Sequence, residues 1–162
     1  MSIEHLKDRA YWVKPGQLLA GGYAGSFTHN GAKEKIDWLL DKGVNFFVDL
    51  TEAGELNPYA PLLPAGITHK RMPIVDMNIP TQTEMVATLD VIDKAIAGKR
   101  GVYVHCWGGK GRTGTVVGCW LVRHGMTPQA ALDQIVRLRD GRKNSPEAPE
   151  QFAFIRNWKE GQ

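Results

Sequence analysis

Short runs of β-branched and aromatic residues alternate with helix-like segments along this chain, and this alternation restricts the fold more than any other feature. The run "VNFFVDL" at 44–50 follows the segment "AKEKIDWLLDKG" at 32–43, where Ile36, Leu39 and Leu40 recur at helical spacing before a glycine. Strands that alternate with helices indicate a single α/β domain with a central, mostly parallel sheet flanked by helices. The predicted strands are 17–25, 44–50, 67–75 and 101–105, and the predicted helices are 32–43, 81–97, 113–125, 127–138 and 148–159.

Local signals support several of these boundaries. The sequence "TQTE" at 81–84 is a capping box that opens a helix, and Thr127 followed by Pro128 is a second helix start. Three prolines make 57–66 a loop. We therefore predict one domain over 1–162, with its core at about 12–160.

Size and charge exclude several classes of protein. With 162 residues and a net charge of +3, the chain suits an anionic ligand but lacks the dense basic stripes of a nucleic-acid binder. No apolar run approaches the ~20 residues that span a bilayer, so no stable membrane association is expected. Two cysteines cannot form a disulfide framework. We expect a cytoplasmic monomer that binds no nucleic acid.

The segment "HCWGGKGRTG" at 105–114 leaves a predicted strand and enters a predicted helix. Gly108, Gly109 and Gly111 let the backbone curl, so that loop amides and the positive helix N-terminus surround one point. Such a nest binds an oxyanion. It is not a Walker nucleotide loop, because a glycine follows Lys110 where that motif requires serine or threonine.

Cys106 and Arg112 lie at the two ends of this nest. The loop amides, the helix dipole and Arg112 would all favour the thiolate form of the cysteine. The loop is long enough to curl back, so that the planar guanidinium of Arg112 could hold two phosphate oxygens. A cysteine after a strand is often only a small buried core residue, and a glycine-rich turn often serves only close packing. The combination of the two with Arg112 predicts a nucleophile beside a bound phosphate.

These residues resemble the His-Cys-x5-Arg-Ser/Thr signature of the cysteine-dependent protein tyrosine and dual-specificity phosphatases. Chain size and element order resemble the compact dual-specificity branch from about Trp12 to the last helix. The resemblance implies a phosphotyrosine protein phosphatase-like fold and a two-step reaction through a phosphocysteine at Cys106, without metal or other cofactor. It also implies a phosphate-binding loop made of Trp107, Gly108, Gly109, Lys110, Gly111 and Arg112.

Such a reaction needs a proton donor for the leaving group. Members of the family carry an aspartate about thirty residues before the cysteine, and Asp76 in "PIVDMNIP" lies thirty positions upstream, between Pro73 and Pro80. We predict that Asp76 is the general acid, although a turn aspartate is the common alternative. Asp49 and Glu52 are rival carboxylates, and Asp49 is expected to make structural hydrogen bonds.

Three neighbours of the cysteine have predicted roles. The Thr113 hydroxyl could donate to the Cys106 sulfur and help it leave in the second step, or cap the helix. His105 is interpreted as a residue that orients the loop, since a preformed thiolate needs no base. Cys119 is predicted to be a core residue, and a resolving thiol is the alternative.

Two further positions stay open. Gln151 lies where related phosphatases can carry a polar residue that orients the attacking water, but it could equally be an ordinary exposed helix residue. Arg142 and Lys143 could add positive potential near the site, or form a solvated charged loop.

The substrate is predicted to be a phosphorylated protein, with another phosphomonoester as the alternative. Lys110 would suit a polyanionic phosphoinositide, whereas Trp107 offers a flat apolar surface that suits an aromatic phosphate or the pocket rim. A non-catalytic phosphate-binding module is disfavoured because Cys106, Arg112 and Asp76 are all present. A sulfurtransferase or arsenate reductase would not need the upstream acid, and the mild charge does not support an RNA triphosphatase.

Overall fold

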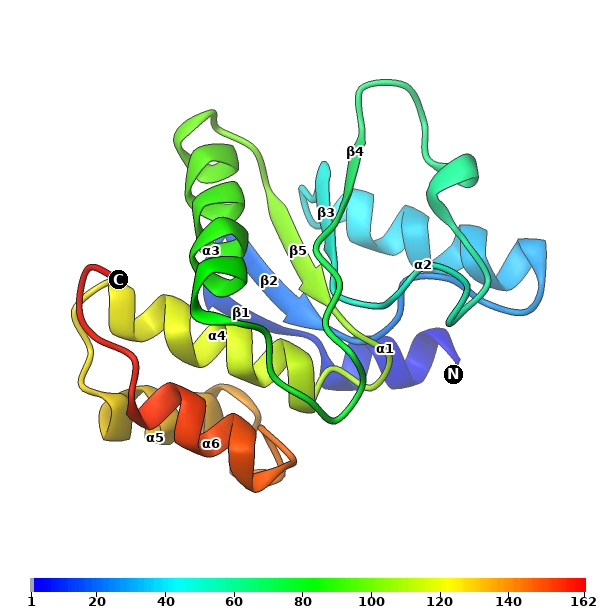
Figure 1. Cartoon of the computed structure of the whole chain (residues 1–162). Coiled ribbons are helices and arrows are strands. Elements are labelled where there is room, and N and C mark those ends of the chain that lie inside the picture. Colours follow the sequence, from blue (N-terminus) through cyan, green and yellow to red (C-terminus); the bar gives the residue numbers. More distant parts are fainter. Residues whose placement is uncertain (1) are drawn as a thin grey trace.

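A five-stranded sheet forms the centre of the computed structural model, which describes residues 2–162 (Figure 1). The strand order is β1-β2-β5-β3-β4, and only the β1–β2 pair is antiparallel. The predicted α/β architecture with a mostly parallel sheet is therefore confirmed. The strands are β1 Tyr11–Lys14, β2 Leu18–Gly21, β3 Phe46–Asp49, β4 Thr68–Arg71 and β5 Val102–His105.

Helices cover both faces of this sheet. Along β5, Val102 and Val104 pack into a cluster with α3, α4, α5 and α6, while Tyr103 packs on the opposite face with α1 and α2. Consecutive strand residues point to opposite faces, so one strand serves both clusters. The helices are α1 Ile3–Arg9, α2 His29–Asp41, α3 Gln82–Ala97, α4 Gly111–Arg123, α5 Pro128–Leu138 and α6 Pro149–Arg156, with a short 3-10 helix, η1, at Ala60–Leu62.

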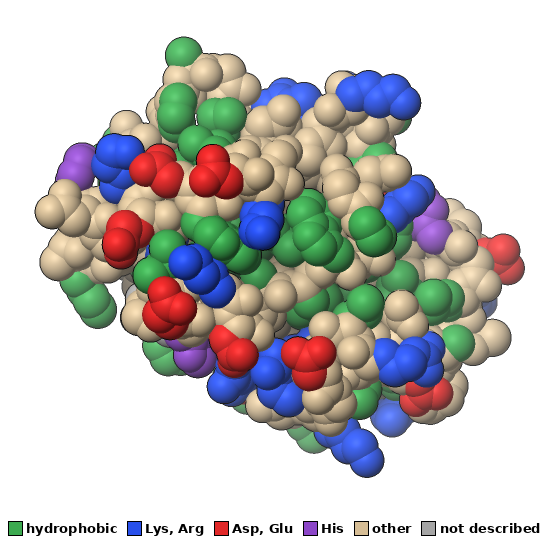
Figure 2. All heavy atoms as spheres, turned by 180° about the vertical axis from the view of Figure 1, so that it is seen from behind, with side chains coloured by type: hydrophobic (Ala, Val, Ile, Leu, Met, Phe, Trp, Pro, Cys, Tyr) green, Lys and Arg blue, Asp and Glu red, His purple; other side chains and the backbone are tan. Residues whose placement is uncertain are grey.

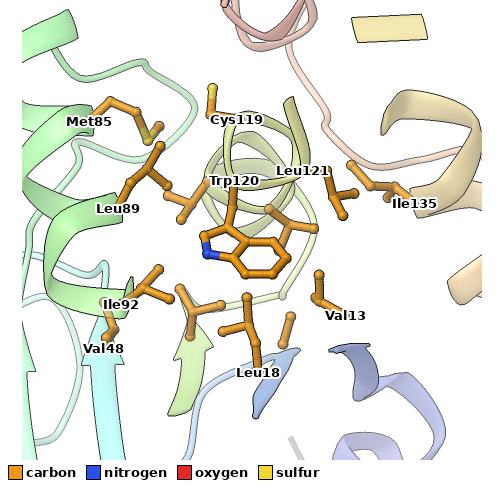
Figure 3. Packing of buried hydrophobic residues seen from close by; sticks show 14 of the residues in the cluster. Val13, Leu18, Val48, Met85, Leu89, Ile92, Cys119, Trp120, Leu121 and Ile135 are labelled. Atoms are coloured by element: carbon orange, nitrogen blue, oxygen red, sulfur yellow. The ribbon is translucent and has the colours of Figure 1, made fainter. Parts of the chain in front are cut away.

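The helix α4 is the most deeply buried helix among the described residues, because it lies between the sheet and the helices α5 and α6. Its residues 111–122 are all buried. Figure 3 shows Trp120 of α4 in the larger cluster, near Leu18 of β2 and Ile92 of α3. The Trp120 indole N–H donates to the Asp93 carboxylate at 2.8 Å, so its polar atom is satisfied. A helix held from several sides keeps its N-terminus in place.

The structure differs from the sequence prediction at the N-terminus and at several helix boundaries: α2 begins at His29 rather than at residue 32, and α6 ends at Arg156 rather than at residue 159. The helix α1 and the strand β1 were not predicted, because each is too short to show a periodic pattern. The helix α4 begins at Gly111 rather than at residue 113, so Arg112 belongs to its first turn. The capping box at Thr81 and the Thr127 cap are both present. Within residues 2–162, no helix is both long and apolar enough to cross a membrane.

Candidate active site

The glycine-rich loop lies at the carboxyl end of the central strand. Strand β5 ends at His105, residues 106–110 form the turn, and α4 begins at Gly111. Among residues 2–162 no side chain caps α4, so the amides of its first turn have no intrahelical or side-chain partner there and remain free for a ligand. The loop thus places free amides and a positive helix end around one point, as an anion site requires.

Gly109 has a backbone conformation that only glycine tolerates here. Its φ is +73°, and its amide N–H donates to the Cys106 sulfur at 3.3 Å. An added Cβ would lie 2.6 Å from the carbonyl carbon of Gly21 on β2. Gly108, by contrast, has nothing within 4 Å of an added Cβ. Of these two glycines, only Gly109 is therefore packed closely against β2.

We expect Gly109→Ala to cut kcat/KM for a small aryl phosphate by about 10²-fold, because the amide that bonds the sulfur must move. The Gly108→Ala variant is the matched control and should stay within a few-fold of the native protein. Steady-state phosphate release from both variants, alongside their melting temperatures, checks this. Similar activities in the two variants would contradict the packing argument.

Cys106 lies at the base of the nest with its side chain almost fully enclosed. It is 3% exposed, and the Thr113 hydroxyl donates to its sulfur at 3.1 Å. Together with the Gly109 amide, two donors point at one sulfur. The two donors fix the position of the sulfur at the base of the nest. The structure brings Thr113 to the position that the sequence predicted, and its role in the reaction stays a prediction.

Arg112 is held by a bidentate pair with Glu55. The Nη1 and Nη2 atoms donate to the two Glu55 carboxylate oxygens at 2.8 Å each, and Nη1 also donates to the Ile74 carbonyl at 3.0 Å. Arg112 is 1% exposed, yet its Nε has no partner among the described residues. Glu55 thus occupies the edge formed by Nη1 and Nη2, and Nε is the donor of Arg112 that remains for a phosphate oxygen.

The ion pair between Arg112 and Glu55 also shifts the pKa of both side chains. Burial alone would lower the pKa of Arg112, but the hydrogen bonds to Glu55 and the nearby negative charges outweigh burial and raise it. The hydrogen bond from Arg112 lowers the pKa of Glu55. Glu55 was not predicted, because a lone glutamate in a loop 57 residues away carries no motif.

We expect Glu55→Gln to lower kcat/KM for a small aryl phosphate by about 10²-fold, because the arginine loses the partner that orients it. Most of the loss should appear as a higher KM, since phosphate binding depends on the free Nε of Arg112. The neighbouring Glu52→Gln change is the control and should have little effect. Initial rates over a range of ester concentrations separate KM from kcat, and an unchanged KM would contradict the expectation.

Asp76 lies at the mouth of the same site. Its Oδ1 is 3.2 Å from Arg112 Nη2, and its side chain is 64% exposed. The loop turns sharply after it, with Met77 at a φ of +62°. The structure therefore brings the predicted acid next to the predicted phosphate clamp.

Gln151 joins this acid loop to α6. Its Nε2 donates to the Asn78 carbonyl at 3.2 Å, while its Oε1 accepts from the Glu147 and Ala148 amides at 3.0 Å. The interpretation of Gln151 as an ordinary exposed residue is wrong, because it is 0% exposed. The cap that it makes at the start of α6 draws its side chain inward, next to Gly111 of the phosphate loop.

His105 lies behind the loop in a buried network. Its Nδ1 is 2.9 Å from the Cys106 carbonyl and its Nε2 is 2.5 Å from the Tyr59 hydroxyl. Burial lowers the pKa of His105, which favours a neutral ring that donates from Nδ1 and accepts at Nε2. Nδ1 then contacts the backbone carbonyl of Cys106 and Nε2 anchors the ring to Tyr59, and the orienting role of His105 stays a prediction.

The rival carboxylate Asp49 belongs to the same network. It accepts from Thr51 at 2.6 Å and pairs with His69 at 2.9 Å. Burial acts to raise the pKa of Asp49, but the hydrogen bonds from His69 and Thr51 lower it overall. Asp49 thus makes structural hydrogen bonds, as expected.

Of the remaining predicted positions, all but Lys110 lie outside the nest. Cys119 is buried in the core, where burial raises the pKa of its thiol. Arg142 donates to the Asp8 carbonyl at 3.3 Å, and Lys143 lines a hollow between α5 and α6. Lys110 lies in the phosphate loop, and its carbonyl accepts from Ser145 at 2.6 Å.

Comparisons with known proteins identify the family. The model of the family described as "Polymorphic toxin system, DSP-PTPase phosphatase" matches residues 22–126, more than half of the chain. The chain belongs to the DSP-PTPase family. The resemblance to the compact dual-specificity branch of the protein tyrosine phosphatases is thereby confirmed.

Individual relatives agree with this membership in the DSP-PTPase family. The chain is 27% identical over 150 residues to the tyrosine-protein phosphatase cdc-14 of Caenorhabditis elegans, covering 85% of the chain and 20% of that protein. It is 37% identical over 121 residues to the putative tyrosine phosphatase 067L of Invertebrate iridescent virus 3, covering 70% and 46%. The chain thus spans less than half the length of these relatives.

A solved structure shows the same fold. The crystal structure of Tk-PTP in the G95A mutant form superimposes with a TM-score of 0.76 at 22% identity, covering 93% of this chain and 94% of that one. The DSP-PTPase fold therefore extends over nearly all of the residues that the structure describes.

Proposed function

We propose that this protein is a cysteine-dependent phosphatase that hydrolyses phosphomonoesters on proteins. The observation that carries the proposal is that one strand–loop–helix unit holds both Cys106, whose sulfur accepts from two donors, and Arg112, whose Nε has no partner among the described residues and whose Nη2 lies 3.2 Å from the Asp76 carboxylate. A nucleophile, a clamp for phosphate oxygens and a proton donor are the parts that this reaction needs.

In the first step, the Cys106 thiolate attacks phosphorus and a sulfur–phosphorus bond forms. The bond between phosphorus and the ester oxygen breaks, and that oxygen takes the proton of Asp76 as it leaves. Arg112 and the loop amides balance the negative charge on the phosphoryl oxygens. The first product is an alcohol or a phenol.

In the second step, Asp76 takes a proton from water as the water oxygen attacks phosphorus. The sulfur–phosphorus bond breaks, and the electron pair returns to Cys106 as a thiolate. The Thr113 hydroxyl, 3.1 Å from the sulfur, stabilises the charge on this leaving group. Inorganic phosphate leaves, and both residues regain their starting states.

The test is phosphate release from p-nitrophenyl phosphate at pH 4.5–8 in the presence of EDTA. Turnover that survives chelation and is blocked by vanadate is the expected result. A folded protein that binds vanadate but releases no phosphate would favour the non-catalytic phosphate-binding module instead.

The surface charge is consistent with a protein substrate, and the two free cysteines are consistent with a reducing compartment. Figure 2 shows basic and acidic side chains interspersed on the face seen from behind. Such mixed charge offers no large basic area to an anionic membrane or nucleic acid on that face. Both cysteines are free, which is typical of cytoplasmic proteins, and we propose a cytoplasmic location.

A further inference from the structure

The exposed large apolar side chains among residues 2–162 come from three segments: the phosphate loop, the acid loop and the stretch just before α2. Trp107 of the loop is 55% exposed, and Phe27 is 92% exposed. The other three, Val75, Met77 and Ile79, are 54%, 48% and 41% exposed and belong to the acid loop that carries Asp76. Exposed apolar side chains that cluster in this way mark a binding surface rather than ordinary scatter.

Phe27 and Trp107 form part of a cavity of about 380 Å³ beside the phosphate loop. Tyr23, Leu56 and Pro58 supply further apolar lining, and Glu55 supplies a charged group. The volume lies within the range of about 300–1,000 Å³ that is usual for ligand sites. The cavity and the candidate active site share Trp107 and Glu55, so a group bound in one lies next to the other.

The walls of the cavity are tied to the catalytic loop. The Tyr23 amide donates to the Trp107 carbonyl at 3.0 Å, and the Tyr23 hydroxyl donates to the Asn57 carbonyl. Glu55 is bound to Arg112 through both carboxylate oxygens. A cavity with bonded walls is preformed, which reduces the entropy lost when a ligand binds.

The chemistry of the lining selects the ligand. No lysine or arginine lines the cavity, and the charge of Glu55 already faces Arg112. A phosphate group or an anionic lipid headgroup in this cavity would be repelled by the Glu55 carboxylate. It would find no lysine or arginine in the lining with which to pair. Aromatic and aliphatic walls instead favour a neutral apolar side chain, and aromatic rings pack well against Trp107 and Phe27.

We infer that this cavity is a specificity subsite for an aromatic side chain within two positions of the phosphorylated residue in a protein substrate. Residues of an extended peptide are spaced by about 3.3–3.6 Å, so a side chain one or two positions away reaches the neighbouring cavity. The inference rests on the proposed function, because it concerns the substrate of the same site.

The experiment compares phosphopeptides that differ only in one flanking residue, alanine or phenylalanine, at each of the positions −2, −1, +1 and +2. Phenylalanine at one of these positions is expected to raise kcat/KM about tenfold. Phe27→Ser should abolish this preference while leaving turnover of p-nitrophenyl phosphate unchanged. Its side chain is 92% exposed, so no core packing is lost. The control is Ile79→Ser. Ile79 is an exposed apolar residue outside the cavity, so this variant should keep the preference.

Four results would overturn the inference. Equal kcat/KM for all peptides, with normal turnover of p-nitrophenyl phosphate, would refute the subsite and leave the proposed function intact. A preference that survives in Phe27→Ser would place its origin elsewhere. Faster hydrolysis of phosphoinositide in vesicles than of any peptide would assign the apolar rim to a membrane. No turnover of either class would refute the proposed function, and the subsite with it.

Discussion

The Cys106→Ser protein is expected to bind phosphate esters and to release no phosphate from them. A serine hydroxyl is not ionised near neutral pH, so it supplies no anionic nucleophile and would also be a poor leaving group in the second step. The groups that bind phosphate are untouched, since the Arg112 clamp and the free amides of α4 do not depend on the sulfur. Binding should therefore persist while turnover is lost.

Two measurements check this expectation. Phosphate release from p-nitrophenyl phosphate measures turnover, and calorimetric titration with a phosphotyrosine peptide measures binding. The matched control is Cys119→Ser, which changes the other free thiol and should keep its turnover per folded molecule. Residual catalysis in Cys106→Ser well above the uncatalysed rate would rule out Cys106 as the nucleophile.

The Asp76→Asn protein is expected to lose about 10²–10⁴-fold in turnover of esters with poor leaving groups, because the amide cannot donate the proton that the leaving oxygen needs. For p-nitrophenyl phosphate the loss should be much smaller, since nitrophenolate leaves without protonation. The Asp76 side chain is 64% exposed, so the change should not affect folding.

The ratio of the two losses is the decisive quantity. Rates on phosphoserine or phenyl phosphate and on p-nitrophenyl phosphate give this ratio directly. The exposed carboxylate Glu52 provides the control, and Glu52→Gln should leave both rates near native. Equal losses on both kinds of ester in Asp76→Asn would move the general acid to another residue.

Local signals explain why much of the fold could be predicted. The Thr81 capping box and the Thr127 cap each act within three residues, and both are present in the structure. The buried strand before Cys106 and the glycines after it specify a strand–loop–helix unit through their own backbone preferences. The elements that escaped prediction, α1 and β1, are short and carry no such pattern.

The contacts that complete the site could not be predicted in this way. Glu55 and Arg112 are 57 residues apart, and Gln151 and Asn78 are 73 residues apart. Neither pair shares a motif. The Glu55–Arg112 pair forms because the segments after β3 and β5 meet at one edge of the sheet, whereas the Gln151–Asn78 pair forms because α6 packs beside the acid loop. The burial of Gln151 likewise depends on where α6 packs.

By itself, the sequence determined the chemistry of the loop: a thiol, three glycines and an arginine within seven residues, between a strand and a helix. The tertiary structure alone decided what surrounds that loop. Strand β5 lies between β2 and β3, and this order brings Phe27, Glu55 and Asp76 to the same edge. The physical reason is the distance along the chain over which each effect acts. Backbone preferences act over a few neighbouring residues, whereas the order of strands depends on how all the apolar faces pack together.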